Sequence, residues 1–216
     1  MENINRRKFI GKTALAAGIG IAGAGALISA CGKKMPENRE MGLPPVLKGA
    51  PAGKKLRAAL IGCGARGTGA AINFISAGPD LEIIGLADVF QDQIDVCRER
   101  FESFNLPIPE ENCFAGFDGY KKVMELPDLD VVLLCTPPQF RPEHFLEAVK
   151  MNKHVFMEKP VAVDPVGIRS VITSARKAEA IGLNVVTGTQ RRHQEDYIET
   201  YKRIKEGAIG RITSAK

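Results

Sequence analysis

The chain has 216 residues, of which 44% are hydrophobic and 25% charged, and these proportions exclude a disordered tail, a collagen-like repeat and a multi-span membrane protein. The formal net charge is +5, but residues 1–30 hold four basic side chains and one acidic side chain, so the remaining residues have a net charge of only +2. This small excess gives no reason to expect a nucleic-acid partner. Five cysteines without a Cys-x-x-Cys pair exclude a zinc ribbon, and we expect no metal site.

Residues 1–31 have the pattern of an export signal. Paired Arg6 and Arg7 stand before Phe9, and an uncharged run rich in alanine and glycine follows over residues 13–30. The paired arginines resemble the twin-arginine (Tat) type of signal, which carries folded proteins across a membrane. The alternative is a transmembrane helix, but 18 residues of this composition are at the minimum length and give little transfer free energy. We therefore expect the Tat export machinery to be a partner of the chain.

The segment that ends at Cys31 resembles a bacterial lipobox. Ile28, Ser29 and Ala30 precede this cysteine at the end of the uncharged run. Lipidation of Cys31 would hold the protein on a membrane surface without spanning the membrane, whereas the alternative is an incidental cysteine. The expected location is on the periplasmic or cell-surface side, with the lipid anchor as the contact with the membrane.

A linker and a folded region follow the predicted signal. Residues 32–54 are rich in proline and glycine, which sustain neither a helix nor a central strand. Residues 55–190 have the length and apolar content of one domain. We therefore predict a linker over 32–54 and a domain over 55–190.

The folded region alternates between predicted strands and predicted helices. Apolar runs predict strands at 56–61, 81–87, 112–116, 131–135, 154–157 and 183–187. Helices are predicted at 66–77, 91–104, 118–125, 141–151, from Pro165 onward, and at 194–206. The helix that begins at Pro165 places Ile168, Val171 and Ile172 on one face. Such alternation is typical of βαβ units and predicts an α/β fold with a Rossmann-type, doubly wound parallel sheet.

A glycine pattern follows the first strand and opens the first helix. It consists of Gly62, Cys63, Gly64, Ala65, Arg66 and Gly67. In the G-x-G-x-x-G pattern, Gly62 allows a tight turn, Gly64 lets the backbone approach a pyrophosphate, and Gly67 lets the helix pack against the strand. Asp88, at the end of the second strand, can bond a ribose diol and would repel a 2′-phosphate, which favours NAD over NADP. Arg66 either contacts the pyrophosphate or is solvated.

Two further strands end in motifs of a different kind. Thr136-Pro137 follows the fourth strand, and Glu158-Lys159-Pro160 follows the fifth. Ligands of open α/β sheets bind beyond the carboxyl ends of the strands, so both motifs are predicted to lie beside the cofactor. A lysine in that place suits proton transfer with a sugar hydroxyl. The alternative is a surface Glu-Lys pair ahead of a turn proline.

Taken together, these motifs resemble those of the Gfo/Idh/MocA oxidoreductases. The glycine pattern, Asp88, Thr136-Pro137 and Lys153-His154-Val155 ahead of Glu158-Lys159-Pro160 carry the resemblance, which extends over residues 55–216. It implies an NAD(P)-dependent enzyme that oxidises or reduces a carbon of a sugar, glycoside or cyclitol. In that family the helix after Thr136-Pro137 often has an early histidine, but Arg141 stands at this place here.

The resemblance also implies roles for individual residues. The implied cofactor-binding residues are Gly62, Cys63, Gly64, Ala65, Arg66, Gly67, Asp88, Thr136, Pro137, Glu158, Lys159 and Gln190. Lys159 is the implied catalytic residue, and Lys159 and Arg191 are the implied substrate contacts. For Arg191 the alternative is a solvated charge.

Three functions remain open on the sequence. The leading one is a sugar or cyclitol oxidoreductase that uses NAD. A redox-neutral, NAD-dependent, glycoside-cleaving enzyme with a tightly held cofactor is the second, because free NAD is scarce outside the cytoplasm. Family members continue into a second domain that supplies much of the sugar pocket and often forms an oligomer. Residues 191–216 are predicted to be only the start of it, so an NAD-binding fragment without turnover is the third.

Overall fold

The structure is a computed structural model that describes residues 53–214. The expected export signal at 1–31, including Cys31, and nearly all of the expected linker at 32–54 lie outside the described residues. Among residues 53–214, no helix combines the length and the hydropathy that a membrane span needs.

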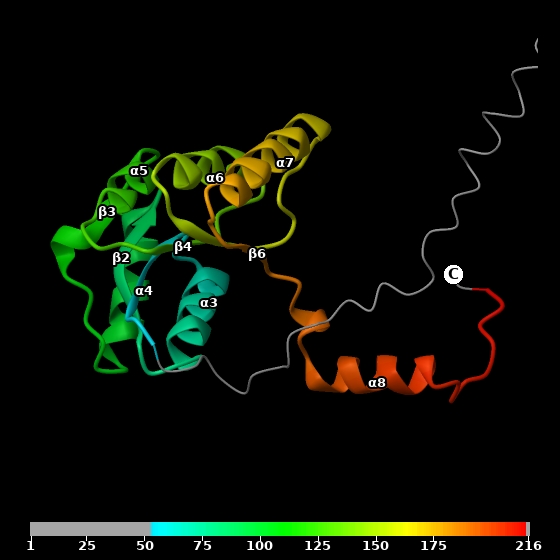
Figure 1. Ribbon diagram of the computed structural model, residues 1–216. Coiled ribbons are helices and arrows are strands. Elements are labelled where there is room, and N and C mark those ends of the chain that lie inside the picture. Colours follow the sequence, from blue (N-terminus) through cyan, green and yellow to red (C-terminus); the bar gives the residue numbers. More distant parts are fainter. Residues whose placement is uncertain (1–52, 215–216) are drawn as a thin grey trace, which may run out of the picture. The chain divides into compact units, whose positions relative to one another are not determined.

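Six parallel strands form one sheet in the order β3-β2-β1-β4-β5-β6 (Figure 1). The strands are β1 (Leu56–Ile61), β2 (Leu81–Asp88), β3 (Cys113–Ala115), β4 (Val131–Leu134), β5 (His154–Met157) and β6 (Val185–Thr187). The direction in which successive strands are added reverses between β1 and β4, which are neighbours in the centre of the sheet. This order confirms the predicted doubly wound sheet, and it opens a crevice for a ligand beyond the carboxyl ends of β1 and β4.

The helices connect the strands and lie close to their predicted positions. They are α3 (Ala65–Ser76), α4 (Gln91–Glu102), α5 (Gly119–Met124), α6 (Arg141–Lys150), α7 (Pro165–Ala180) and α8 (Glu195–Lys205). Two short 3-10 helices, which the sequence analysis did not predict, are η1 (Glu110–Asn112) and η2 (Gln190–Arg192). The Asp164 side chain caps α7, because its Oδ1 accepts a hydrogen bond of 2.6 Å from the Gly167 backbone N–H.

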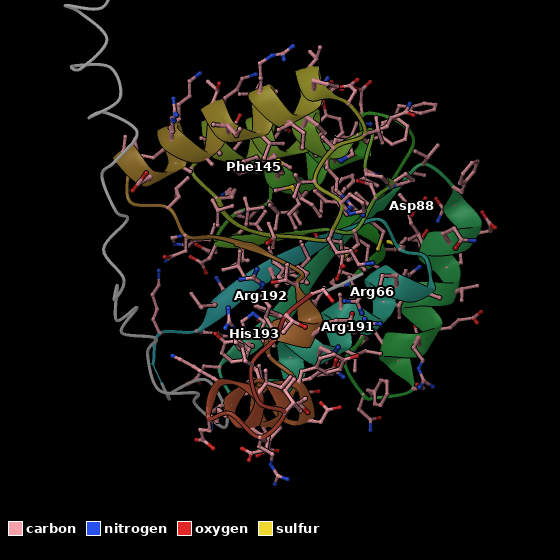
Figure 2. The ribbon with its side chains drawn as sticks, turned by 90° about the vertical axis from the view of Figure 1, so that its right-hand side faces the viewer. Arg66, Asp88, Phe145, Arg191, Arg192 and His193 are labelled. Atoms are coloured by element: carbon pink, nitrogen blue, oxygen red, sulfur yellow. The ribbon has the colours of Figure 1, made fainter. Side chains whose placement is uncertain are left out.

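The sheet separates two apolar cores. Helices α3 and α4 cover one face, where Leu60 and Ile94 are fully buried, and α5, α6 and α7 cover the other face (Figure 1). On that second face Phe145 lies between the sheet and the layer of α6 and α7 (Figure 2). Because both faces are covered, the central strand β4 is apolar throughout, as the sequence predicted.

The face that α7 presents to the core differs in part from the prediction. Val171 is buried, together with Ser174, but Ile168 and Ile172 are 39% and 47% exposed. The helical period is correct, whereas the stripe that packs on the neighbouring layer is rotated toward Ser174.

Candidate active site

The turn after β1, formed by residues 62–67 and called the glycine turn below, leaves no room for side chains at two positions. Gly62 has a φ of +99°, and a Cβ there would lie 2.7 Å from the Thr136 backbone nitrogen. A Cβ at Gly67 would lie 1.8 Å from the Gly62 carbonyl oxygen. The turn therefore packs directly against the end of β4 and the start of α3, which fixes both elements at the switch point of the sheet.

Gly64 has a different environment, which suits a ligand from outside the protein. A Cβ there would meet only the Gln93 side chain, at 3.8 Å, so packing within the protein does not require a glycine. Gly64 is the N-cap of α3, with no side-chain cap and no acidic residue in the first turn of the helix. The free N–H groups and the helix dipole at this end favour an anion such as a pyrophosphate.

The Asp88 carboxylate lies beside the same turn. Its Oδ2 accepts a hydrogen bond of 2.7 Å from the Cys63 backbone N–H, and its Oδ1 accepts one of 3.1 Å from the Phe90 N–H. Cys63 thus contributes its backbone to the site, while its side chain is buried in the core. The two bonds orient a carboxylate that has remaining lone pairs for a ribose diol.

A cavity of about 710 Å³ lies between these groups. Gly62, Gly64, Gly67, Arg66 and Asp88 line one side of it, and the loops after β3 and β4 line the other side. This volume is within the range of small-molecule and cofactor sites. Figure 2 shows Arg66 and Asp88 among the side chains of this part of the domain. The residues present therefore fit a dinucleotide.

Asp88 provides a direct test of cofactor preference. We expect Asp88→Ala to reduce the preference for NADH over NADPH by about 10-fold or more, because the ribose loses a charged acceptor and a 2′-phosphate loses a repelling charge. Fluorescence titration of both reduced cofactors into the full-length variant measures the ratio of the two dissociation constants. An unchanged ratio would show that Asp88 does not contact the ribose.

Buried polar side chains line the cavity wall that α6 provides. His144 Nδ1 lies 3.3 Å from the Thr136 hydroxyl, and the imidazole stacks on the Tyr120 ring with centroids 4.1 Å apart. The Tyr120 hydroxyl in turn donates a hydrogen bond of 3.0 Å to Glu143. Burial lowers the pKa of His144 to about 4, although the Glu143 charge opposes this shift. His144 is therefore neutral at pH 7 and holds Thr136 in place.

The lowered pKa of His144 makes the stability of the fold depend on pH. The histidine takes up a proton near pH 6.5 when unfolded but only near pH 4 when folded, so the free energy of unfolding should fall between pH 6.5 and pH 4. The expected loss from this residue is about 3 kcal/mol. Urea unfolding at several pH values measures it. His144→Gln should be less dependent on pH over this window, and an equal slope would contradict the assignment.

A second cluster joins the glycine turn to the end of β5. The Glu158 carboxylate is 3% exposed and forms an ion pair with the Arg66 guanidinium. Arg141, at the first position of α6, donates hydrogen bonds from Nη1 to the Glu158 carbonyl oxygen, at 2.7 Å, and to the Pro160 carbonyl oxygen. Glu158 is thus buried and paired with Arg66. The Glu158-Lys159-Pro160 motif is therefore not the surface Glu-Lys pair that the sequence left open as an alternative.

The remaining expected site residues lie outside the lining of the cavity. Lys159 follows the buried Glu158 and is itself exposed, as are Gln190 and Arg191 of η2. Arg191, Arg192 and His193 follow one another along this short helix and the residue after it (Figure 2). The Arg191 guanidinium lies 5.5 Å from the centre of the Tyr197 ring of α8, and both side chains are exposed.

Two residues of the site were not predicted from the sequence. Neither His144 nor Arg141 received a role in the sequence analysis, although Arg141 was noted at the place where the family often has a histidine. The available signal was their spacing of three residues, which places both side chains near one side of α6. Within residues 53–214, no group of three or more histidine, cysteine, aspartate or glutamate side chains is arranged to hold a metal ion.

Comparison with known proteins places this geometry in context. Residues 56–186 match the model of the Gfo/Idh/MocA group, described as an oxidoreductase family with an NAD-binding Rossmann fold. A glycosyl hydrolase family 109 protein of Streptomyces coelicolor is 27% identical over 217 residues, which cover 98% of this chain and 44% of the relative. A myo-inositol 2-dehydrogenase of Thermotoga maritima is 27% identical over 74% of this chain and 45% of the relative. The chain thus spans less than half the length of these relatives.

Solved structures share the fold. The myo-inositol 2-dehydrogenase of Lactobacillus plantarum has a TM-score of 0.62 and 22% identity, over 74% of this chain and 43% of that protein. The scyllo-inositol dehydrogenase of Lactobacillus casei, solved with NAD(H) and scyllo-inositol, has a TM-score of 0.60 and 21% identity over 74% of this chain and 44% of that protein. At these identities the likeness establishes the Rossmann architecture.

Proposed function

Because the chain belongs to the Gfo/Idh/MocA oxidoreductase family, we propose that the full-length protein is an NAD(P)-dependent oxidoreductase acting on a hydroxyl-bearing carbon of a sugar, glycoside or cyclitol. The observation that carries the proposal is the ion pair between Arg66 and Glu158. It joins the glycine turn, where the cofactor phosphates would bind, to the segment that presents Lys159. This contact supports a cofactor site and a proton-transfer group at the same edge of the sheet.

The chain contributes separate groups to binding and to chemistry. The N-terminus of α3 and Gly64 would hold the pyrophosphate, and Asp88 would hold the adjacent ribose. A bound nicotinamide cofactor supplies the acceptor or donor of the hydride that the substrate carbon exchanges. Lys159 takes the proton from the hydroxyl oxygen of that carbon during oxidation and returns it during reduction.

A substrate screen tests the proposal. The full-length protein is incubated with NAD⁺ and a panel of inositols, free sugars and glycosides, and absorbance at 340 nm reports NADH. We expect at least one compound of these classes to give NADH in a protein-dependent reaction. Folded protein that binds NAD⁺ but neither reduces it nor alters any compound of the panel would contradict the proposal, and would favour a binding role without turnover.

Redox-neutral cleavage of a glycoside is the second candidate. Its support is the match to proteins named glycosyl hydrolase family 109, which extends over 98% of this chain. The same screen separates the two functions when released sugar is measured beside NADH. Sugar release without net NADH indicates cleavage, whereas equal amounts of NADH and oxidised product indicate simple oxidation.

A further inference from the structure

The buried guanidinium of Arg141 contacts the segment that contains Lys159. Arg141 is 5% exposed, and its Nη1 donates to the carbonyl oxygens of Glu158 and Pro160. One nitrogen therefore binds the backbone on both sides of Lys159. Because the donor is charged, each bond is stronger than an ordinary backbone hydrogen bond.

The placement of Arg141 is costly for the fold. Burial lowers the pKa of Arg141, and its Nε is buried with no hydrogen-bond partner. Its nearby carboxylate, Glu158, already forms an ion pair with Arg66. The charge of Arg141 is thus directed at two carbonyl oxygens rather than at a carboxylate. A side chain that only filled space at this position would not need a guanidinium.

Contacts with β4 and with the segment after β6 also hold Glu158, the residue before Lys159. The Glu158 N–H donates a hydrogen bond of 3.0 Å to the Leu134 carbonyl oxygen of β4. Gly188, after β6, packs so closely on Glu158 that a Cβ there would lie 2.9 Å from Oε2 of the carboxylate. The backbone before Lys159 is therefore held by β4 and by Arg141, and the end of β6 packs against the Glu158 side chain. After Lys159, Arg141 holds the Pro160 carbonyl.

We propose that Arg141 is a positioning residue, whose guanidinium fixes the backbone on both sides of Lys159 and so directs the amino group of this lysine toward the substrate. Lys159 is exposed, and its backbone conformation sets the direction of its Cα–Cβ bond and limits the rotamers of its side chain. The inference rests on the proposed function, because that function gives Lys159 its role in proton transfer.

The test compares three variants of the full-length protein. Arg141→Met keeps a long side chain but removes every hydrogen-bond donor. Arg141→Lys keeps a charged hydrogen-bond donor but lacks the planar guanidinium group. Arg169→Met is the matched control, because Arg169 is an exposed arginine of the neighbouring helix α7. For each protein we would measure kcat, the KM for NAD⁺ and for substrate, and the melting temperature.

We expect Arg141→Met to lower kcat by about 100-fold, the effect of misplacing a catalytic group by about 1 Å, with a KM for NAD⁺ close to that of the unmodified protein. Arg141→Lys should recover part of this loss, and Arg169→Met should show none. A kcat of Arg141→Met equal to that of the unmodified protein would overturn the proposal. If Arg141→Met does not fold, Arg141→Gln, which has no charge, replaces it, and a kcat of that variant equal to that of the unmodified protein would also overturn the proposal.

A second readout does not depend on turnover. Acetylation of lysines by an amine-reactive ester, followed by peptide mass spectrometry, gives the rate of modification at Lys159 and at the exposed Lys177 of α7. In Arg141→Met, or in Arg141→Gln if Arg141→Met does not fold, we expect a changed rate at Lys159 and an unchanged rate at Lys177. Unchanged rates at both would overturn the positioning role. Failure of the proposed function is recognised separately, because the unmodified protein would then neither produce NADH nor alter any compound of the panel.

Discussion

Lys159→Ala in the full-length protein is expected to lower kcat by about 10²- to 10⁴-fold while NAD⁺ still binds, because the variant loses its proton-transfer group but keeps the glycine turn and Asp88. Steady-state kinetics on the substrate found in the screen, with a separate binding titration, measure both effects. The expected separation of turnover from binding follows from the structure, in which Lys159 lies outside the cavity that Asp88 lines.

The exposed lysine of α7 provides the control for this prediction. Lys177→Ala removes a charge of the same type from the same domain, and both turnover and binding should be unchanged. Turnover of Lys159→Ala within a factor of about two of the unmodified protein would remove Lys159 from the mechanism, since general acid–base groups contribute far more than this. Loss of NAD⁺ binding in Lys159→Ala would assign the residue to the cofactor instead.

Gly67→Ala should be the most damaging single substitution in the glycine turn. The added Cβ would lie 1.8 Å from the Gly62 carbonyl oxygen, and this neighbour is backbone that cannot rotate away. We expect the free energy of unfolding to fall by about 3 kcal/mol, with weaker NAD⁺ binding as the turn moves away from the start of α3. Urea unfolding and binding titration measure the two effects.

Another glycine of α3 separates this steric effect from a general effect of alanine. A Cβ at Gly69 would meet nothing within 4 Å. Gly69→Ala should therefore be neutral or raise the free energy of unfolding by up to about 1 kcal/mol, because alanine favours a helix. Equal destabilisation of Gly67→Ala and Gly69→Ala would contradict the close packing of the turn on β1 and α3.

The sequence predicted the fold well because the fold depends on local patterns. The strands are mostly short apolar runs, and the alternation of strands with helices permits few topologies. The motif at Gly62 to Gly67 could be placed for the same reason. The face of α7 was less predictable, because Ile168 and Ile172 fit a helical stripe equally well whether or not another layer covers them.

The contacts that shape the candidate site could not be predicted from local patterns. Arg66 and Glu158 are 92 positions apart, so their ion pair depends on the order of strands in the sheet and on side-chain direction. The hydrogen bonds from Arg141 to the Glu158 and Pro160 carbonyl oxygens depend on where α6 begins relative to the end of β5. A single sequence gives residue types at these positions, but it does not give the distances between them.

Calorimetric titration of NAD⁺ into the full-length protein, after removal of any co-purified nucleotide, tests the central claim most directly. The account predicts one NAD⁺ bound per chain, with tighter binding of NAD⁺ than of NADP⁺, because we expect the Asp88 carboxylate to repel a 2′-phosphate. Folded protein that binds neither NAD⁺ nor NADP⁺ would contradict the assignment of the cavity at Gly62, Gly67 and Asp88 to a dinucleotide, and with it the proposed function.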